Sequence, residues 1–194
     1  AQPYSQAAEK VLALIDDLRT SGFPIDTLDI GGGFGAAYVT GEAPAFTDYA
    51  DRLAPVLDPL AAEGLKIIVE PGRSIAASAG VLLTRVEYVK RGDAKTFVIC
   101  DAGMHTLMRP SHYGAFHFAW PAQVDPSRQP PRRDLSIDLP GLHAVDLVGP
   151  ICETGDFLAE NRSIPPVGRG DLIAVFTAGA YGAAMASNYN THAL

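Results

Sequence analysis

The sequence predicts the last part of an α/β barrel followed by a mostly antiparallel β-domain. Helix-forming and strand-forming segments alternate over residues 1–79, which is the order that builds a parallel sheet or barrel. From residue 80 onward, segments rich in β-branched and aromatic residues follow one another as candidate strands. We therefore expect the last βα units of a barrel over 1–79 and a β-domain over 80–194.

Two helices are expected in the first domain. Over residues 5–20 apolar side chains recur at helical spacing, and Gly22 follows as a helix stop. A second apolar face begins after Thr47, a residue able to cap a helix, and ends at Gly64. Two prolines inside this second segment weaken its helical pattern, because an interior proline removes a backbone donor and usually bends the helix.

Short strands that run into glycine turns follow the first and the second helix, over residues 28–30 and 65–73. In the second domain, residues 81–90 and 95–101 are rich in strand formers and are joined by Arg-Gly-Asp. This pattern predicts a β-hairpin.

The rest of the second domain is expected to be strands separated by loops. Further strands are predicted over residues 143–151 and 171–177, with residues 163–171 as loop between them. Residues 121–141 carry five prolines and three arginines with little periodicity, which predicts a surface loop. Small residues over 178–190 suggest the start of a closely packed helix.

Composition excludes several classes of protein. A net charge of −7 without a basic block argues against nucleic acid and anionic membranes as partners. No apolar run reaches the length of about 18 residues that a membrane-spanning helix needs, so no membrane partner is expected. The two cysteines fit a reducing cytoplasm, where we expect the protein to act.

Two glycine motifs end the strands of the first domain. GGGFGA (31–36) formally fits a dinucleotide fingerprint, but the proline that follows at position 44 leaves no room for the required helix. Its consecutive glycines suit either a phosphate cradle or a tight turn. EPGR (70–73) places a carboxylate and a guanidinium at the end of a barrel strand, where chemistry or a surface salt bridge is equally consistent.

Three stretches of the second domain carry further candidates. RPSHYGAFH (109–117) contains an arginine and a tyrosine able to hold a carboxylate, and its histidine spacing suits no metal. Tyr181 lies between glycines, where core packing and a phosphate contact are both open. GPICETGD (149–156) places Cys152 beside Glu153 between two turns, so this thiol is either a buried small side chain or a proton donor.

In combination these stretches resemble the pyridoxal-phosphate-dependent group IV decarboxylases of the alanine-racemase-like fold. The resemblance rests on five segments in the family's order: LDIGGGFG, IVEPGRS, DAGMHTLMRPSHYGAFH, GPICETGD and AGAYGAAMASNYN. Within the family, the R-P-x-x-Y-G-A-x-H stretch and the Glu after the Cys resemble the diaminopimelate decarboxylase branch. The activity implied is decarboxylation of meso-2,6-diaminopimelate to L-lysine, the last step of lysine biosynthesis.

The resemblance also implies roles for individual residues, with pyridoxal 5'-phosphate as the cofactor. The expected cofactor contacts are Gly31, Gly32, Gly33, Glu70, Gly72, Arg73 and Tyr181, with Glu70 on the pyridinium nitrogen. The expected substrate contacts are Arg73, Arg109, Tyr113, Glu153 and Tyr181, with Glu153 on the distal ammonium. Cys152 is the expected catalytic proton donor. It and Glu153 are expected to reach the partner subunit's site in a homodimer with shared active sites. The terminal segment of the β-domain is expected to return to the active site.

One departure from the family concerns lysine. The family's Schiff-base lysine follows an early barrel strand, whereas Lys10, Lys66, Lys90 and Lys95 all lie in other sequence contexts. We therefore expect a fragment that lacks the first half of the barrel and is inactive alone. The alternatives are a decarboxylase for ornithine or arginine, and a non-catalytic homologue that regulates a partner.

Overall fold

The computed structural model describes residues 2–40 and 43–193, with side chains from residue 6 onward. The outermost residues of the two expected domains, 1 and 194, lie outside the described residues. The chain divides into two compact units. The smaller unit comprises Ala1–Gly35 and Ala43–Gly72, and the larger one Ala36–Glu42 and Arg73–Leu194.

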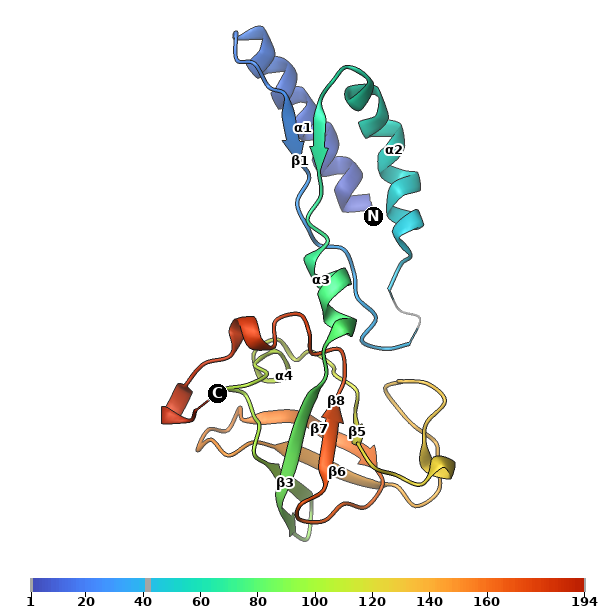
Figure 1. Ribbon diagram of the computed structural model, residues 1–194, viewed down its shortest axis with the longest axis vertical. Coiled ribbons are helices and arrows are strands. Elements are labelled where there is room, and N and C mark those ends of the chain that lie inside the picture. The colour runs from blue at the N-terminus through green and yellow to red at the C-terminus, as the bar shows by residue number, and fades with distance from the viewer. Residues whose placement is uncertain (1, 41–42, 194) are drawn as a thin grey trace. The chain divides into compact units, whose positions relative to one another are not determined.

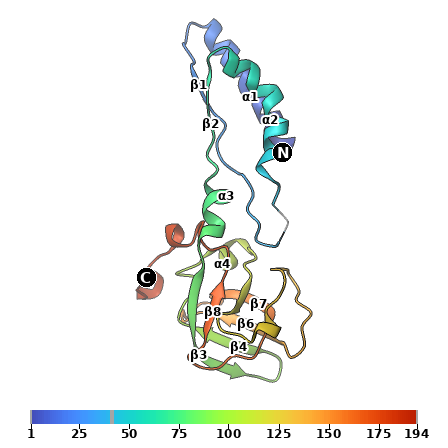
Figure 2. The same cartoon turned by 45° about the vertical axis from the view of Figure 1, so that its right-hand side comes forward.

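The smaller unit alternates helix and strand as the sequence predicts. Its elements are α1 (Gln2–Thr20), β1 (Thr27–Asp29), α2 (Phe46–Ala62) and β2 (Lys66–Ile68). The two strands pair in parallel, with Leu28 opposite Ile67. Both helices lie on one side of this strand pair (Figure 2). Between helices and strands lies a small core made of Ile15, Leu28, Leu53, Leu57 and Leu65.

Helix α2 forms despite its two interior prolines. Pro55 and Pro59 are exposed, so carbonyl groups that lose a helical partner there can bind water instead. The expected cap at Thr47 is wrong, because the N-cap residue is Ala45. The backbone N–H of Ala45 donates to the Asp48 carboxylate at 2.8 Å, which is the side-chain half of a capping box.

The larger unit contains a six-stranded sheet (Figure 1). Its strands are β3 (Leu82–Arg91), β4 (Thr96–Cys100), β5 (Ala119–Pro121), β6 (His143–Val148), β7 (Phe157–Ile164) and β8 (Leu172–Val175). The spatial order is β5-β8-β3-β4-β6-β7, and in the part of this sheet that the structure describes only β4 and β6 pair in parallel. The expectation of a mostly antiparallel sheet is therefore confirmed, including the hairpin of β3 and β4.

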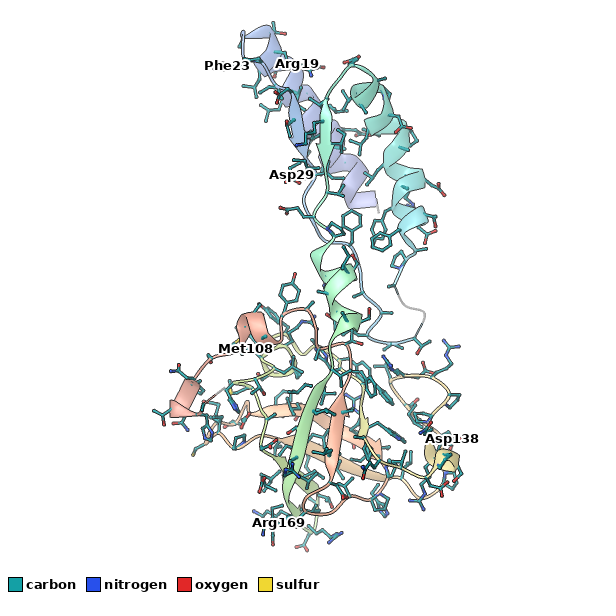
Figure 3. All side chains as sticks on the ribbon, in the orientation of Figure 1. Arg19, Phe23, Asp29, Met108, Asp138 and Arg169 are labelled. Atoms are coloured by element: carbon teal, nitrogen blue, oxygen red, sulfur yellow. The ribbon has the colours of Figure 1, made fainter. Side chains whose placement is uncertain are left out.

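Short helical segments join these strands. They are α3 (Gly72–Ala76), η1 (Ala77–Ala79), α4 (Arg109–Tyr113), η2 (Pro126–Arg128), η3 (Ala183–Met185) and η4 (Tyr189–Thr191). The loop that contains Asp138, labelled in Figure 3, is largely exposed over residues 121–141, as predicted. In the described part of the chain, no helix combines the length and hydropathy that a membrane span requires.

Two expectations for the larger unit are wrong. Strands β5 and β7 have no counterpart among the predicted strands, and the predicted loop at 163–171 overlaps the end of β7. Residues 178–190 form only the single turns η3 and η4 instead of a helix. Their small residues serve close backbone packing, since a Cβ at Gly80 would lie 2.5 Å from the Cα of Gly179.

The compact units meet in sequence at residues 72 and 73, whereas the sequence analysis divides the domains at residues 79 and 80. Helix α3 and the turn η1 fall between these two positions. The assignment of residues 1–79 to a barrel stays a prediction.

Candidate functional site

The two glycine motifs of the smaller unit lie side by side. Beyond the regular pairing of β1 and β2, the N–H of Ile30 donates to the carbonyl of Ile68 at 3.0 Å. The N–H of Glu70 then donates to the carbonyl of Gly31 at 2.9 Å. These bonds extend the parallel pairing into the loops, so GGG and EPG meet at the carboxyl ends of the two strands.

The glycines in these loops are required by the backbone. Gly31 and Gly33 have φ angles of 71° and 92°, in the left-handed region that favours glycine. A Cβ on Gly32 would lie 2.7 Å from the carbonyl oxygen of Glu70, closer than side chains approach. No other residue type fits between the two loops at that position.

Two of the N–H groups expected to hold a phosphate already have partners within the unit. The N–H of Gly31 donates to the carboxylate of Asp29 at 2.8 Å, and Asp29 stands at the end of β1 (Figure 3). The N–H of Gly72 donates to the carbonyl of Glu70 at 2.8 Å. These bonds shape the two loops whether or not an anion is bound.

Arg109 opens helix α4 and is 9% exposed in the larger unit. Pro110 follows it in the first turn, where a missing N–H costs nothing, and Gly114 ends the helix at a φ of 59°. The ring of Tyr38 lies against the guanidinium, with Cζ 4.4 Å from the ring centroid. The ring centroid of Tyr181 lies 5.9 Å from the same carbon. Two predicted substrate contacts, Arg109 and Tyr181, are thus brought together.

His117 is fully buried beside Arg109. Its Nε2 lies 2.9 Å from a terminal nitrogen of Arg109, and its Nδ1 lies 3.0 Å from the carbonyl oxygen of Phe176. Burial, with a smaller contribution from the Arg109 charge, lowers the pKa of His117 to about 4. Both ring nitrogens of His117 therefore have hydrogen-bond partners within the larger unit. Across the described residues, no three His, Cys, Asp or Glu side chains gather as a metal site requires.

The loop of residues 149–156 is anchored by the buried carboxylate of Asp156. One oxygen accepts the N–H of Met104 and the other accepts the N–H of Ile151, both at 2.6 Å. Two glycines give the carboxylate room, because a Cβ on either would collide with it: Gly103 and Gly149. The base of the loop is therefore fixed by a side chain, and not only by its glycine turns.

The predicted functional residues of this loop point away from the core. Cys152 and Glu153 are exposed, and the Glu153 carboxylate accepts the N–H of Gly155 at 3.4 Å. Gly155 lies beside α4, since a Cβ there would be 4.0 Å from the Cβ of Ser111. The loop and the helix that carries Arg109 are thus neighbours in the larger unit.

The remaining predicted contacts are placed as follows. Tyr113 ends α4, is 61% exposed and packs edge-on against the ring of His112. Arg73 is half-buried in α3. Met108, labelled in Figure 3, is the N-cap residue of α4 and immediately precedes Arg109.

Sequence reasoning missed the part that Tyr38 takes in this cluster. Tyr38 lies in the segment 36–42, which groups with the larger unit although the glycine motif directly precedes it. Its ring also meets that of His117 edge-on, with centroids 5.1 Å apart. A lone tyrosine in an irregular segment carries no periodic signal, so the pattern alone could not place it.

Comparison with known proteins gives consistent results. The family described as "Pyridoxal-dependent decarboxylase, C-terminal sheet domain" matches residues 12–179. The diaminopimelate decarboxylase of Aquifex aeolicus is 46% identical over 189 residues, which are 97% of this chain and 41% of that protein. The one from Pseudomonas aeruginosa is 45% identical over 190 residues, 98% of this chain and 42% of its own length.

A solved structure agrees with these relatives. The crystal structure of diaminopimelate decarboxylase from Helicobacter pylori complexed with L-lysine has a TM-score of 0.81 at 37% identity. The alignment covers 97% of this chain and 43% of that one. The chain therefore spans about two fifths of the length of the relatives it matches. With a family match over most of its residues, the chain belongs to the pyridoxal-dependent decarboxylases and carries their C-terminal sheet domain.

Proposed function

We propose that this chain is the C-terminal part of a cytoplasmic decarboxylase that converts meso-diaminopimelate to L-lysine with pyridoxal phosphate. The observation that carries the proposal is the setting of Arg109. Arg109 is 9% exposed as a residue, and no carboxylate of the described residues lies within 4 Å of its guanidinium. A buried charge without a counter-ion is costly, so this arginine is suited to receive a carboxylate from a ligand. Relatives named diaminopimelate decarboxylase support the choice of ligand.

The glycine loops of the smaller unit fit the cofactor's phosphate. The contact between Gly32 and Glu70 leaves room for backbone only, and a phosphate can approach such a surface closely. Pyridoxal phosphate, when bound, supplies an electron sink for the substrate carbon that loses carbon dioxide. The contacts proposed for it are Gly31, Gly32, Gly33, Glu70, Gly72, Arg73 and Tyr181. Because the N–H groups of Gly31 and Gly72 already have partners, these two residues would contribute through the close approach of their backbone.

Charged groups of the chain match a diamino diacid. Arg109 would hold one carboxylate through its planar fork, with Arg73 and Tyr113 as further contacts. Glu153 would hold the distal ammonium, the one end of the substrate that needs an anion. Because both Cys152 and Glu153 are exposed on a loop with a fixed base, we assign them to the site of a partner subunit in a homodimer.

Cys152 would complete the reaction. Breaking the bond to the carboxylate releases carbon dioxide and leaves its electron pair on the substrate carbon. The Cys152 thiol donates a proton to that carbon, and the thiolate recovers a proton from water. The sum is diaminopimelate plus a proton giving lysine plus carbon dioxide. We further propose that an N-terminal half-barrel supplies the lysine that attaches the cofactor, so that this chain alone is inactive.

The test is expression of the complete reading frame that carries this chain in a bacterium without diaminopimelate decarboxylase. Growth without added lysine, and faster turnover of meso-diaminopimelate than of ornithine or arginine, is expected. If the enzyme turns over ornithine or arginine faster, that amino acid would replace diaminopimelate as the proposed substrate. Absence of turnover with all three would favour the non-catalytic homologue.

Variants assign the roles of individual residues. In the complete enzyme, Arg109→Ala should raise KM for diaminopimelate, because losing a bidentate carboxylate contact typically costs about 2–5 kcal/mol of binding free energy. The cofactor content of the enzyme should stay unchanged. Cys152→Ala should slow lysine formation and let pyridoxamine phosphate accumulate. Cys100→Ala is the matched control, because Cys100 is fully buried and burial raises its pKa to about 12.

A further inference from the structure

The hydrogen-bond partners of His117 determine its tautomer. Arg109 has only donors to offer, so the Nε2 that faces it must be the bare, accepting nitrogen. The carbonyl of Phe176 has only lone pairs, so Nδ1 must carry the proton and donate it. Both ring nitrogens are used, in one orientation of the ring only.

We propose that His117 is a positioning residue that fixes the Arg109 guanidinium for the substrate carboxylate, with Tyr38 supporting its face. This inference rests on the proposed function of Arg109 and adds a residue to it. An unheld arginine rotates about several side-chain bonds, and ordering it on binding costs free energy. When the guanidinium is already held at one nitrogen and one face, folding has ordered most of the side chain. Substrate binding then has little of this ordering cost left to meet.

His117 holds the edge of the guanidinium. The 2.9 Å contact engages one terminal nitrogen and leaves the remaining N–H donors of the fork for a ligand. The acceptor is neutral, so it does not compensate the arginine charge as an aspartate would. A carboxylate at this position would pair with Arg109 and compete with the substrate.

Tyr38 holds the face of the guanidinium. Its ring lies 4.4 Å from Cζ, a distance suited to cation–π attraction. The same ring meets His117 edge-on at 5.1 Å, so the three side chains contact one another pairwise. The Tyr38 hydroxyl is buried and has no hydrogen-bond partner in the described part of the chain. The ring and not the hydroxyl is therefore the part that supports Arg109.

The neutral state of His117 is maintained near pH 7. Its side chain is fully buried, and burial together with the Arg109 charge lowers its pKa to about 4. An imidazolium would present N–H groups on both sides and could no longer accept from Arg109. The contact therefore persists across the pH range in which biosynthetic enzymes work.

The test compares His117→Gln with His117→Met. Glutamine can place an amide oxygen near the position of Nε2, whereas methionine has a similar length without a comparable acceptor. In the complete enzyme, His117→Met should raise KM for diaminopimelate about tenfold or more with kcat and cofactor content nearly unchanged. His117→Gln should stay within about threefold of wild type, because a neutral acceptor is retained. Equal KM values for wild type and His117→Met would overturn the proposal.

Tyr38 is tested by a matched pair of variants. Tyr38→Leu should raise KM, whereas Tyr38→Phe keeps the ring and should leave KM unchanged. A raised KM for Tyr38→Phe equal to that of Tyr38→Leu would overturn the assignment of this role to the ring.

Nuclear magnetic resonance separates this inference from the proposed function. In the full chain, the nitrogen shifts of His117 should show the Nδ1–H tautomer, and the two terminal nitrogens of Arg109 should give separate signals from hindered rotation. Arg109 rotation should become free in His117→Met and stay hindered in His117→Gln. An Nε2–H tautomer, or free rotation of Arg109 in wild type, overturns the inference even if diaminopimelate is the substrate. Hindered rotation with no turnover of diaminopimelate would instead overturn only the substrate.

Discussion

Among the described residues, the core cluster of the smaller unit contains five buried hydrophobic side chains and that of the larger unit contains sixteen. The two units also hold their motifs in different ways. In the smaller unit, loop shape comes from backbone pairing and from glycines that leave no space for a side chain. In the larger unit, Arg109 and the loop of residues 149–156 are held by buried side chains, His117 and Asp156. Side-chain positioning of this kind requires a closed core around it.

The smaller unit has no such core. A cavity of about 520 Å³ runs along α2 and is lined largely by apolar side chains, Phe34 and Leu57 among them. Its sheet consists of β1 and β2, and a two-stranded sheet is at best marginally stable without further cover. The comparison indicates that the larger unit can hold Arg109 and the loop of residues 149–156 by itself, whereas the smaller unit depends more on what packs against it.

Core truncation gives the largest expected difference between the units. Leu147 in β6 is fully buried, so Leu147→Ala should lower the free energy of unfolding by about 3–5 kcal/mol. Leu53 in α2 borders the open cavity, so Leu53→Ala creates less new void and should cost about 2 kcal/mol or less.

Urea denaturation measures both losses. Fluorescence of Trp120, the single tryptophan, reports the larger unit, and helical circular dichroism reports mainly α1 and α2. Equal losses for the two variants would contradict the contrast between a closed and an open core.

Regular periodicity explains how much of this fold could be predicted. The helices of the smaller unit and the hairpin of β3 and β4 follow from apolar spacing and a short turn. Strand β7 was not predicted because Glu160, Asn161 and Arg162 interrupt its alternation of apolar and polar residues. Asn161 also has a φ of 46°, which is not a strand conformation. The pairing register of β6 with β7 shifts between Val145 and Leu147, opposite this interruption, so the pattern is broken by an irregularity of the sheet.

The candidate site was predictable to the extent that motifs repeat the family's residues. The contact of Arg109 with Tyr181 joins two stretches that the sequence analysis had singled out. The contact of Tyr38 with Arg109 could not be derived, because it depends on the path of residues 36–42 and not on spacing. The small residues near Gly179 were misread as helical, although they serve the close approach to Gly80.

The two loop anchors give the next difference. Asp156 is 4% exposed, and its two carboxylate oxygens accept the N–H groups of Met104 and Ile151. In Asp156→Asn the side-chain NH₂ group replaces one of these oxygens and faces a backbone N–H, so two donors meet. We expect a loss of about 2–3 kcal/mol, in the range for buried hydrogen bonds to charged groups. Asp29→Asn in the smaller unit is the matched control, and because its bond to Gly31 is exposed the cost should be below about 1 kcal/mol. The same denaturation curves provide the measurement, and a larger loss for Asp29→Asn would reverse the comparison.

Acid should destabilise the larger unit selectively. All five histidines lie in it, and the pKa of His117 is lowered from 6.5 to about 4 by burial and by the Arg109 charge. Between these values the unfolded chain binds more protons than the folded one, so stability falls as pH decreases from 6.5 towards 4. From pH 7 to pH 5 the contribution of His117 amounts to about 2 kcal/mol.

The pH dependence is isolated by comparison with His117→Gln. Every other histidine is present in both proteins, including His105, whose pKa is also lowered by burial. The difference between the two stability profiles therefore reports His117 alone. Parallel profiles from pH 7 to pH 5 would show that His117 is not buried in its neutral form.

The smallest expected effect concerns surface charge. In the larger unit the ammonium of Lys95 lies 2.6 Å from the carboxylate of Asp146, and this hydrogen bond raises the pKa of Lys95. The Lys95 side chain is 55% exposed, so solvent screens its charge, whereas the Asp146 side chain is only 7% exposed. Asp146 also accepts the N–H of Asn161 at 2.6 Å, and this donor remains in Lys95→Met, so stability should fall only slightly. In the smaller unit, a terminal nitrogen of Arg19 lies 3.9 Å from a carboxylate oxygen of Glu63, and Glu63→Gln should lower stability still less.

Two conditions test the electrostatic origin of the Lys95 effect. A raised pKa means that the pair stabilises the fold while lysine is protonated and that this contribution is lost as pH rises through the folded-state pKa. The difference between wild type and Lys95→Met should therefore disappear at strongly alkaline pH, and it should shrink at about 1 M salt, where the Debye length is about 3 Å. A difference that persists under both conditions would assign the effect to packing of the lysine stem.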